Sequence, residues 1–406
     1  MSWRERLGRN WGRLGMRSEW ITSTIDDICK LVTDGAHNSP KSVDNGYYMA
    51  SVKDFTAYGF DFSNCRKISE ADYLKLKKQG CVPESGDILV GKDGARYFED
   101  VIIYRQKEQP ALLSSIAILR VDDTKVTSEF LYYTLKSPAV KKDVRDNYGS
   151  GSAIPRIVLK DFKRMPISFP SLKEQKKITN ICELLDEKIQ LNNRINNNLA
   201  DLLQAVYQEQ FGDIESAENQ GTLSDICMYS KEKVVISALN ISNYFSTENM
   251  LVDKGGATIA SSLPTVAQTT ACHKGDTLIS NIRPYFKKIV YCEADCGCSA
   301  DVLCFTPNRP QYSAYLFSSL YADSFFAFMV AGAKGTKMPR GDKQQIMTYP
   351  VVLPSNEKLE MFNAIALPTL GQIHSNRAEN KRLSAMRDTL LPKLMSGELD
   401  VSDIEL

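Results

Sequence analysis

The chain has 406 residues, 43% of them hydrophobic and 24% charged, which is the balance of an ordinary globular protein with two or three domains. Its formal net charge of +1 excludes the overall basic excess of a histone-like DNA-binding protein. Charge alone therefore favours a protein without a polyanionic partner, unless basic residues cluster locally or partner chains supply them.

The N-terminal segment, residues 1–17, carries five arginines but no apolar stretch, so we do not expect a secretory signal peptide. We interpret it as a basic tail that is either disordered or precedes a later start at Met16. An arm that contacts DNA is the alternative. No apolar run in the chain approaches the ~18 residues that a membrane-spanning helix needs, so no membrane association is expected.

Short apolar runs bounded by Gly, Asp and Pro predict strands in both halves of the chain. They include Gly86-Asp-Ile-Leu-Val-Gly, Val101-Ile-Ile-Tyr, Ile116-Ala-Ile-Leu-Arg-Val and Asp276-Thr-Leu-Ile-Ser. A helix is expected after the last strand of each half, at 128–136 and 311–321. Each half is therefore predicted to begin with a mixed, strand-rich part.

Residues 171–211 contain neither Pro nor Gly and predict one long helix. Ser171 is the expected N-cap, with Glu174 completing a capping box. Asn192 and Asn196 are expected on or beside the apolar stripe, where polar residues set the register of a helix pair. The stripe itself has spacings of three and four and comprises Ile178, Ile181, Leu185, Ile189, Ile195, Leu199, Leu202 and Val206.

A second long helix is predicted from Ser355 to about Met395, and two such helices in one chain are expected to pair antiparallel. Pro368 and Gly371 are expected to kink or break it, because proline removes a backbone hydrogen bond and clashes with the preceding turn. Pro392 and Gly397 are expected to end it. Its apolar stripe comprises Leu359, Phe362, Ile365, Ile373, Leu383, Met386 and Leu390.

The chain repeats itself. A shift of 184 positions places residues 155–211 on residues 339–395, so that Pro155-Arg156 falls on Pro339-Arg340. Earlier matches need small shifts: Gly86-Asp87 corresponds to Gly275-Asp276, and residues 114–119 correspond to 299–304. We infer one unit of roughly 190 residues used twice.

The ten cysteines are expected to be free, strand-buried thiols, and no metal site is expected. A zinc site needs two well-spaced ligand pairs, whereas the chain has no CxxC and the spacing within its one group of neighbouring cysteines is irregular. That cluster comprises Cys292, Cys296, Cys298 and Cys304, with His273 as the nearest histidine. Unpaired thiols suit a reducing cytosol.

Motifs for catalysis are missing from the sequence: there is no HExxH, P-loop, GxSxG or GxGxxG followed by an acidic residue. A duplicated chain without a catalyst predicts binding at two places. Two alternatives stay open. One is a nuclease with an unrecognised active site around Asp87, Lys92 and Asp93, and the other is a coiled-coil interaction scaffold that does not bind DNA.

Basic residues cluster locally, at equivalent places in both halves and beside glycines that let a backbone approach a ligand. Arg and Lys there can reach phosphates or guanine edges. The candidates for DNA binding are Lys92, Arg96, Arg156, Lys160 and Arg164 in the first half, and Arg283, Lys287, Lys288, Lys334, Lys337, Arg340 and Lys343 in the second.

Four segments resemble the specificity subunit of Type I restriction–modification systems, and the resemblance covers about residues 18–400. They are Thr33-Asp-Gly-Ala-His-Asn-Ser-Pro, Gly275-Asp-Thr-Leu-Ile-Ser-Asn-Ile-Arg-Pro, Pro170-Ser-Leu-Lys-Glu-Gln-Lys-Lys-Ile and Leu390-Leu-Pro-Lys-Leu-Met-Ser-Gly-Glu-Leu. Two features depart from the family pattern: the N-terminal tail, and the start of the second helix at Asn356-Glu-Lys-Leu-Glu.

The resemblance implies an α+β fold with two mixed target recognition domains, separated by two antiparallel, coiled-coil-like spacer helices in a pseudo-twofold repeat. The implied boundaries are 1–17 for the tail, 18–170 and 215–353 for the recognition domains, 171–214 for the first spacer helix, and 354–406 for the second with its C-terminal tail.

The family's function implies a non-catalytic subunit that reads a bipartite site in double-stranded DNA. Two modification (methyltransferase) subunits would bind the helices and methylate adenine, and restriction (motor-nuclease) subunits would join them. No cofactor is expected on this chain, because S-adenosylmethionine, ATP and Mg²⁺ would be bound by the partners. A cytoplasmic, prokaryotic location is expected.

Overall fold

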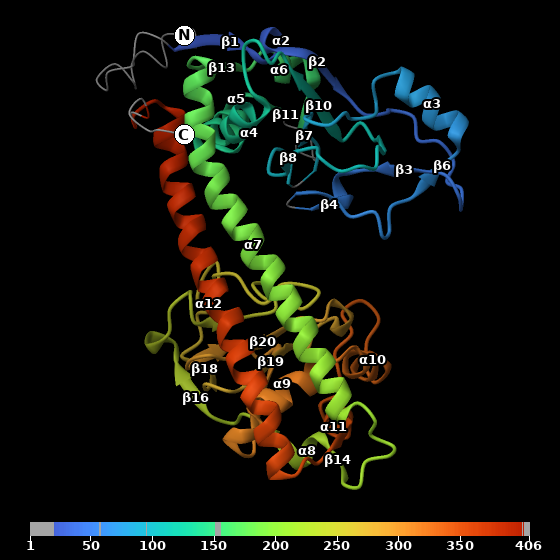
Figure 1. The fold of residues 1–406 in the computed structure, drawn as a ribbon, viewed down its shortest axis with the longest axis vertical. Coiled ribbons are helices and arrows are strands. Elements are labelled where there is room, and N and C mark those ends of the chain that lie inside the picture. Colours follow the sequence, from blue (N-terminus) through green and yellow to red (C-terminus); the bar gives the residue numbers. More distant parts are fainter. Residues whose placement is uncertain (1–19, 57, 95, 151–155, 400, 402–406) are drawn as a thin grey trace. The chain divides into compact units, whose positions relative to one another are not determined.

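A computed structural model describes residues 20–56, 58–94, 96–150, 156–399 and 401, so the tail at 1–17 lies outside the described residues. The chain divides into two compact units. Unit 1 comprises Met1–Lys188 and Arg382–Leu406, and unit 2 comprises Ile189–Lys381. Each unit contains strands, short helices and parts of two long helices (Figure 1).

Unit 1 contains β1 (Ile21–Thr24), α2 (Ile25–Ile28), β2 (Cys29–Asp34), β3 (Tyr47–Ala50), η1 (Val52–Asp54), β4 (Phe55–Thr56), β5 (Gly59–Phe60), β6 (Lys67–Ile68), α3 (Glu70–Lys78), β7 (Ile88–Gly91), β8 (Val101–Ile103), β9 (Ala111–Leu112), β10 (Ile116–Val121), α4 (Ser128–Lys136), α5 (Pro138–Asn147), β11 (Gly149–Ser150), β12 (Arg156–Ile157), α6 (Leu159–Lys163) and β13 (Pro166–Phe169). The long helix α7 (Leu172–Phe211) starts here.

The central layer of unit 1 is an antiparallel sheet in the order β2-β10-β7-β8. Successive residues of β7 face opposite sides of this sheet, as in any strand. Ile88 and Val90 enter the main core, which α4, α7 and the C-terminal end of the last helix complete. Leu89 enters a second core with Ile116 and Ile118. Burial on both faces explains why these strands read as continuous apolar runs.

Unit 2 contains β14 (Gln220–Thr222), α8 (Leu223–Ile226), β15 (Cys227–Tyr229), β16 (Lys233–Val235), η2 (Ile236–Ala238), β17 (Tyr244–Phe245), β18 (Gln268–Cys272), β19 (Thr277–Ser280), η3 (Pro284–Phe286), β20 (Ile289–Tyr291), β21 (Cys296–Cys298), β22 (Val302–Pro307), η4 (Pro310–Tyr312), α9 (Ser313–Tyr321), α10 (Asp323–Ala331), α11 (Lys343–Met347) and β23 (Pro350–Val352). The second long helix, α12 (Asn356–Met395), follows.

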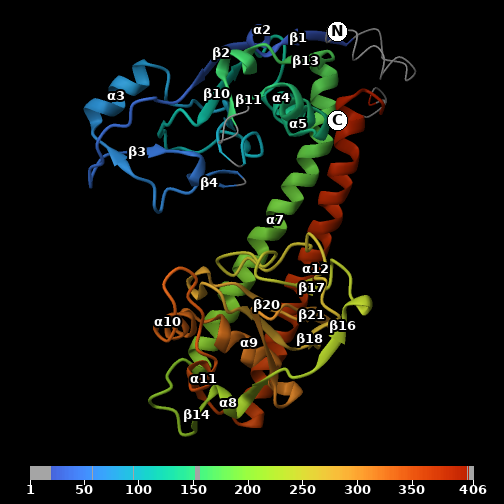
Figure 2. The same cartoon turned by 180° about the vertical axis from the view of Figure 1, so that it is seen from behind.

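The sheet of unit 2, β15-β22-β19-β20, has the same strand order and directions as that of unit 1. Here too alternate residues enter two cores: Ile279 lies with α9 and α12 in the main one, and Leu278 lies with buried cysteines in the other. A second sheet of unit 2 has the order β16-β18-β21-β17, and Figure 2 shows it from behind. The internal repeat is therefore a repeat of structure.

One part of the sequence alignment was wrong by a residue. Residues 114–119 were matched to 299–304, but the strand pairing equates Ile118 with Cys304. Both residues face the second residue of the central strand, Leu89 in unit 1 and Leu278 in unit 2. Few side chains are identical in these strands, so only the register distinguishes the two alignments.

The long helix at 171–211 is confirmed as α7, and Ser171 caps it by accepting a hydrogen bond from the Glu174 N–H at 3.4 Å. Its buried side differs from the predicted stripe. Ile178 and Ile189 are buried, and Ile181, Leu185 and Leu199 are partly buried. Leu202 is 51% exposed and Ile195 is 37% exposed, so their assignment to the packing stripe was wrong. The buried positions between and beyond are Gln175, Thr179, Cys182, Asp186, Asn192, Asn196, Leu203, Tyr207 and Phe211.

The second helix, α12, is continuous from Asn356 to Met395, so of the kink or break expected at Pro368 and Gly371 the break was wrong. A proline inside a helix costs about 3 kcal/mol. Burial of Phe362, Ala366 and Leu370 around it outweighs this cost, since each of these residues packs in the core of unit 2. Pro392 also lies within the helix and does not end it.

Among its predicted packing residues, Ile373 is buried and Leu383 is partly buried. Ile365 is 43% exposed, and its assignment to the packing stripe was wrong.

Helices α7 and α12 run antiparallel and side by side within each unit. In unit 2 the amide of Asn192 donates to Asn380 at 2.9 Å, and Asn376 donates to Asn196 at 2.9 Å. In unit 1 Arg387 forms an ion pair with Asp186 at 2.6 Å. Residues of higher number in α7 contact residues of lower number in α12, so the two helices run antiparallel.

In the part of the chain that the structure describes, no single helix is long and apolar enough to cross a membrane. One bent pair, Pro310–Tyr321 with Asp323–Ala331 at 67°, reaches the necessary length and composition jointly. Most of α9 and several residues of α10 are buried in the core of unit 2.

Candidate nucleic-acid interface

A tight turn after β2 supports the loop that follows strand β7 in unit 1. Asp34 forms an ion pair with Lys92 at 3.3 Å, and its other carboxylate oxygen lies 3.2 Å from the His37 Nε2. Gly35 packs directly on the backbone of β9, because an added Cβ would lie 2.3 Å from the Leu112 carbonyl oxygen. The Thr33–Pro40 motif thus has a structural role in holding the loop that follows β7.

Each unit has a Gly-Asp turn immediately before its central strand. Gly86 and Gly275 adopt left-handed backbone angles, with φ of 94° and 93°. Asp87 and Asp276 are buried and accept the backbone N–H three residues earlier, at 2.7 Å and 2.8 Å. The desolvation of burial raises the pKa of Asp276. These turns start the strands whose far ends carry the basic residues.

At the far end of the central strand, each unit brings two distant segments together. In unit 1 the Ile157 N–H donates to the Lys92 carbonyl at 3.0 Å, and Asp93 bridges to Arg156. In unit 2 the Gly341 N–H donates to the Asn281 carbonyl at 3.3 Å. We call each meeting point the strand-end surface of its unit: 92–94 and 96–97 with 156–164 in unit 1, and 281–288 with 334–343 in unit 2.

In unit 2 this meeting point also pairs Ile282 with Arg340 as a β-bridge. Arg340 therefore occupies the position that Arg156 holds in unit 1, as the shift of 184 residues predicted.

In unit 1 the candidate basic residues have different surroundings. Lys92 is only 8% exposed and bound to Asp34, so it is not among the exposed cations of this surface. Arg96 is exposed and paired with Asp100 at 2.6 Å, and Arg164 is paired with Asp161. Arg156 and Lys160 are exposed, and among the described residues neither has a carboxylate partner.

In unit 2 three of the candidates form exposed or half-exposed ion pairs. Arg340 binds Asp301 at 2.9 Å and is 55% exposed, Lys287 binds Asp323 at 2.9 Å, and Lys334 binds Asp342. Exposed pairs of this kind contribute about 0–1 kcal/mol, so the cations can exchange their carboxylates for phosphates at little cost.

The remaining candidates of unit 2 divide into two groups. Lys337 and Lys343 are exposed, and Lys343 lies 6.0 Å from the Tyr229 ring centroid. Arg283 has a left-handed φ of 52° and is partly buried, and its guanidinium lies 3.5 Å from the Lys337 carbonyl. Lys288 donates to the Thr247 carbonyl at 2.6 Å, and burial lowers the pKa of its ammonium. Arg283 and Lys288 therefore shape the surface more than they project from it.

Sequence reasoning missed two residues of this region. Lys254 shares the carboxylate of Asp323 with Lys287, at 2.8 Å. Asn281 is buried, and its Oδ1 has no hydrogen-bond partner among the described residues. Neither residue carries a local signal, because Lys254 lies far along the chain from Asp323, and a single buried Asn looks like any polar residue at a strand end.

The proposed nuclease cluster does not form. Asp87 is 2% exposed, and the Arg120 guanidinium binds both of its oxygens at 2.9 Å. Lys92 is held by Asp34, as described above. A carboxylate that is buried and bound in this way has no free oxygen to present to a metal or to DNA.

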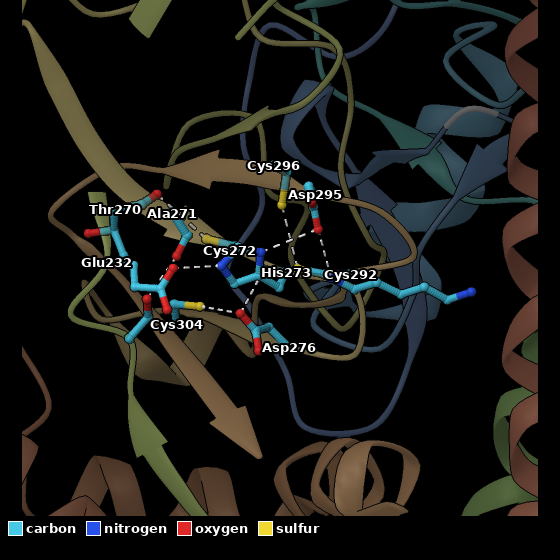
Figure 3. A network of polar contacts seen from close by, with 12 residues as sticks. Glu232, Thr270, Ala271, Cys272, His273, Asp276, Cys292, Asp295, Cys296 and Cys304 are labelled. Carbon is cyan, nitrogen blue, oxygen red and sulfur yellow. Dashed lines mark hydrogen bonds and ion pairs between the residues drawn. The ribbon is translucent and has the colours of Figure 1, made fainter. Parts of the chain in front are cut away.

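A network of polar contacts joins buried thiols of the second core of unit 2 to carboxylates at its border (Figure 3). His273 contacts Glu232 at 3.0 Å, and this partner raises the pKa of the imidazole. The Cys292 and Cys296 sulfurs are 3.6 Å apart, and the Cys304 thiol lies 3.2 Å from Asp276. All ten cysteines are free. No three His, Cys, Asp or Glu side chains of the described residues are placed to hold a metal ion.

Comparison with known proteins places the chain in a family. Residues 17–201 match the family model of the Type I restriction modification DNA specificity domain. The chain is 22% identical over 306 residues to the Type I restriction enzyme MjaIX specificity subunit of Methanocaldococcus jannaschii, covering 69% of this chain and 71% of that protein. A local match to the Type I restriction enzyme HindI specificity subunit of Haemophilus influenzae is 30% identical over 94 residues, or 23% of this chain and 20% of that protein.

The fold is similar to the crystal structure of the Type I restriction–modification system S subunit from M. genitalium. The TM-score is 0.57 at 17% identity, and the match covers 94% of this chain and 97% of that one. This likeness shows the fold: two β-rich domains with two long packed helices. The chain therefore belongs to the family of specificity subunits of Type I restriction–modification systems, the non-catalytic subunits that direct recognition of the DNA target.

Proposed function

We propose that each unit reads one half of a bipartite site in double-stranded DNA through its strand-end surface. The observation that carries this proposal is the equivalent placement of Arg156 and Arg340, each beside the end of the central strand of its unit. A cation that recurs at one structural position, with different neighbours, suits two readers of different sequences. We assign residues 18–170 and 215–353 to the recognition domains, and 171–214 and 354–406 to the spacer helices and the C-terminal tail.

The side chains that we expect to contact DNA are exposed or half-exposed cations on these two surfaces. An arginine can bind phosphate oxygens or the O6 and N7 atoms of guanine through two parallel hydrogen bonds, whereas lysine acts mainly as a point charge. The near-neutral net charge of the chain does not oppose this function, because the cations are concentrated locally. The proposed contacts are Arg96, Arg156, Lys160, Arg164, Lys287, Lys334, Lys337, Arg340 and Lys343.

We propose that α7 binds a modification subunit through apolar side chains that the chain itself leaves exposed. In unit 2, Leu191, Ile195 and Leu202 are 43%, 37% and 51% exposed. Their spacing of four and seven residues places them on one side of the helix. A row of exposed leucine and isoleucine is typical of an interface between subunits.

The partners, rather than this chain, would supply the chemistry. Two modification subunits would bind S-adenosylmethionine and methylate adenine, and restriction subunits would bring ATP- and Mg²⁺-dependent cleavage. We place the assembly in the prokaryotic cytoplasm, where the ten free thiols stay reduced.

Arginine substitutions in the complex with the modification subunit test the proposal. Replacing Arg340 with Ala should weaken binding of the DNA target site by about 1–3 kcal/mol if the side chain reads a base. Arg156→Ala should weaken binding to the other half-site by a similar amount. DNA affinity should be measured by fluorescence anisotropy over a range of salt concentrations, because loss of a phosphate contact lowers the salt slope by about one.

Arg309→Ala is the matched control. Arg309 is exposed and follows the end of β22, whereas Arg340 pairs with Asp301 before the start of the same strand. Its substitution should leave DNA affinity unchanged. If Arg340→Ala and Arg309→Ala behave alike, the strand-end surface of unit 2 is not the DNA-reading surface.

A further inference from the structure

Unit 2 contains a cavity of about 340 Å³ between its long helices and the loop at 251–255. The cavity is within the size range of small-molecule sites. Side chains from α7, α12, β20 and α9 line it, and most are polar or aromatic. Residues 281–288 and 334–343 of the strand-end surface contribute none of the lining residues, although the Asp253 and Lys254 N–H groups of the lining loop donate to the Phe286 and Lys287 carbonyls at 2.9 Å.

Arg377 on α12 supplies a positive charge to the lining of this cavity. No ion pair or hydrogen bond joins its guanidinium to any described residue, although it is partly buried. Burial lowers the pKa of Arg377, which is the direction expected when a charge is desolvated without a counter-charge. A desolvated, unpaired guanidinium is unfavourable, so its retention calls for a compensating anion.

Two asparagines of α7 add neutral donors. Asn193 accepts a hydrogen bond from Asn380 at 2.8 Å through its Oδ1, and Asn196 accepts one from Asn376 at 2.9 Å in the same way. Each side-chain amide has one oxygen and one NH₂ group. Because α12 occupies both oxygens, the NH₂ groups of these two cavity-lining residues are the atoms available to a ligand.

The loop at 251–256 closes one side of the cavity against Arg377. A Cβ on Gly256, whose φ is 83°, would lie 2.9 Å from the guanidinium carbon of Arg377. The loop also holds two non-glycine residues in the left-handed region, Asp253 and Lys254, with φ of 51° and 61°. Strained backbone of this kind persists where the surrounding structure enforces it, and it is frequent at ligand sites.

The other charged groups limit what the cavity can hold. Lys254 is already paired with Asp323 at 2.8 Å and lies over the Tyr321 ring at 4.5 Å. Asp253 and Glu293 contribute carboxylates to the lining. One compact anionic group therefore fits better than a polyphosphate, whose further charges would face these carboxylates.

We propose that this cavity binds an oxyanion, a phosphate or carboxylate group, through the Arg377 guanidinium with the Asn193 and Asn196 amides as additional donors. The planar fork of arginine matches two oxygens of such a group. The anion is either a small solute or a carboxylate side chain of a partner subunit that docks on the two helices; only the second source rests on the proposed function. In both cases the bound group would join α7, α12 and the loop of unit 2.

Inorganic phosphate tests the first source on the full chain. Phosphate, compared with chloride at equal ionic strength, should raise the unfolding temperature of the wild type and of Arg382→Met equally. Arg382 is an exposed arginine on the same helix and serves as the control. For Arg377→Met, the rise in unfolding temperature should need about tenfold more phosphate or be absent. Without phosphate, Arg377→Met should unfold at a temperature no lower than the wild type, since it removes an unpaired charge.

Assembly with the modification subunit tests the second source. If phosphate has no effect on the wild type, but Arg377→Met weakens subunit binding about tenfold and Arg382→Met does not, the anion is a partner carboxylate. Should Arg377→Met fail to fold, protection of Arg377 from phenylglyoxal by phosphate or by the partner decides instead. Equal phosphate response in all three proteins together with unchanged assembly, or absence of any protection, overturns the proposal, whether or not DNA recognition stands.

Discussion

At the scale of single residues, the partner of a side chain decides its role more than its type does. Lys92 lies in the basic cluster that the sequence assigned to DNA, yet it is buried and paired with Asp34. Arg156, which reaches the same place from another segment, is exposed. The pairing of Lys92 with Asp34 joins residues far apart in the chain, so no local pattern could reveal it.

Gln175 shows how a family motif acts. It is fully buried, donates to the carbonyls of Lys125 and Pro170 at 3.0 Å and 2.9 Å, and accepts from the Thr127 N–H at 2.9 Å. It thereby fixes the first turn of α7 to the start of α4. The equivalent residue of unit 2 is Leu359, which is buried in an apolar core instead. The departure at the start of the second helix thus replaces hydrogen bonds by packing.

We predict that Gln175→Ala destabilises unit 1 by roughly 2–4 kcal/mol, because buried backbone groups at Lys125 and Thr127 lose their partner. Gln175→Leu should be destabilising too, although leucine is accepted at Leu359. Urea unfolding and hydrogen exchange of the α4 amides measure the effect. Lys176→Ala, at an exposed neighbouring position, is the control, and an unchanged urea midpoint for Gln175→Ala would refute this role.

At the scale of elements, the extent and antiparallel pairing of the two long helices were predictable, but the buried side of each was not. The 3–4 periodicity located α7 to within a residue. Its buried side was misassigned because it carries polar residues such as Asp186, Asn192 and Asn196, while Leu202 faces outward. If α7 also binds the modification subunit, as proposed, it has two sides with apolar residues, and periodicity alone cannot separate them.

We expect Leu202→Asp to leave the stability of the isolated chain within about 0.5 kcal/mol of the wild type, as for other exposed positions. Its affinity for the modification subunit should fall by about 1–3 kcal/mol, since a charge would enter an apolar interface. Calorimetry of the chain and titration with the partner give the two quantities. Gln208→Asp, about 120° around the helix, should change neither. A Leu202→Asp chain that binds normally would remove this side of α7 from the interface.

The continuity of α12 through Pro368 shows that tertiary packing can override a local signal for a helix break. The local signal for a break was strong, but Phe362, Ala366 and Leu370 all lie in one core, and their burial holds the helix together. Local propensity is a weak predictor where tertiary packing is extensive.

At the scale of the whole molecule, duplication was the most informative feature of the sequence. It predicted two units of like structure, and the sheets of units 1 and 2 have the same strand order. The Gly-Asp turns and the arginines at 156 and 340 also occupy equivalent positions. Contacts between residues far apart in the chain could not be predicted from the sequence. They are the ion pairs of the basic residues, the hydrogen bonds between asparagine side chains of α7 and α12, and the cavity at Arg377.

The most direct test of the account is a map of adenine methylation in the genome of a host with and without this gene. We predict that one split motif with a constant gap loses methylation when the gene is deleted, and regains it when the wild-type gene is restored. Deletion of the neighbouring modification gene is the control that this system is active. If that control removes a motif while deletion of this gene leaves every motif methylated, the chain does not direct DNA target recognition in its host.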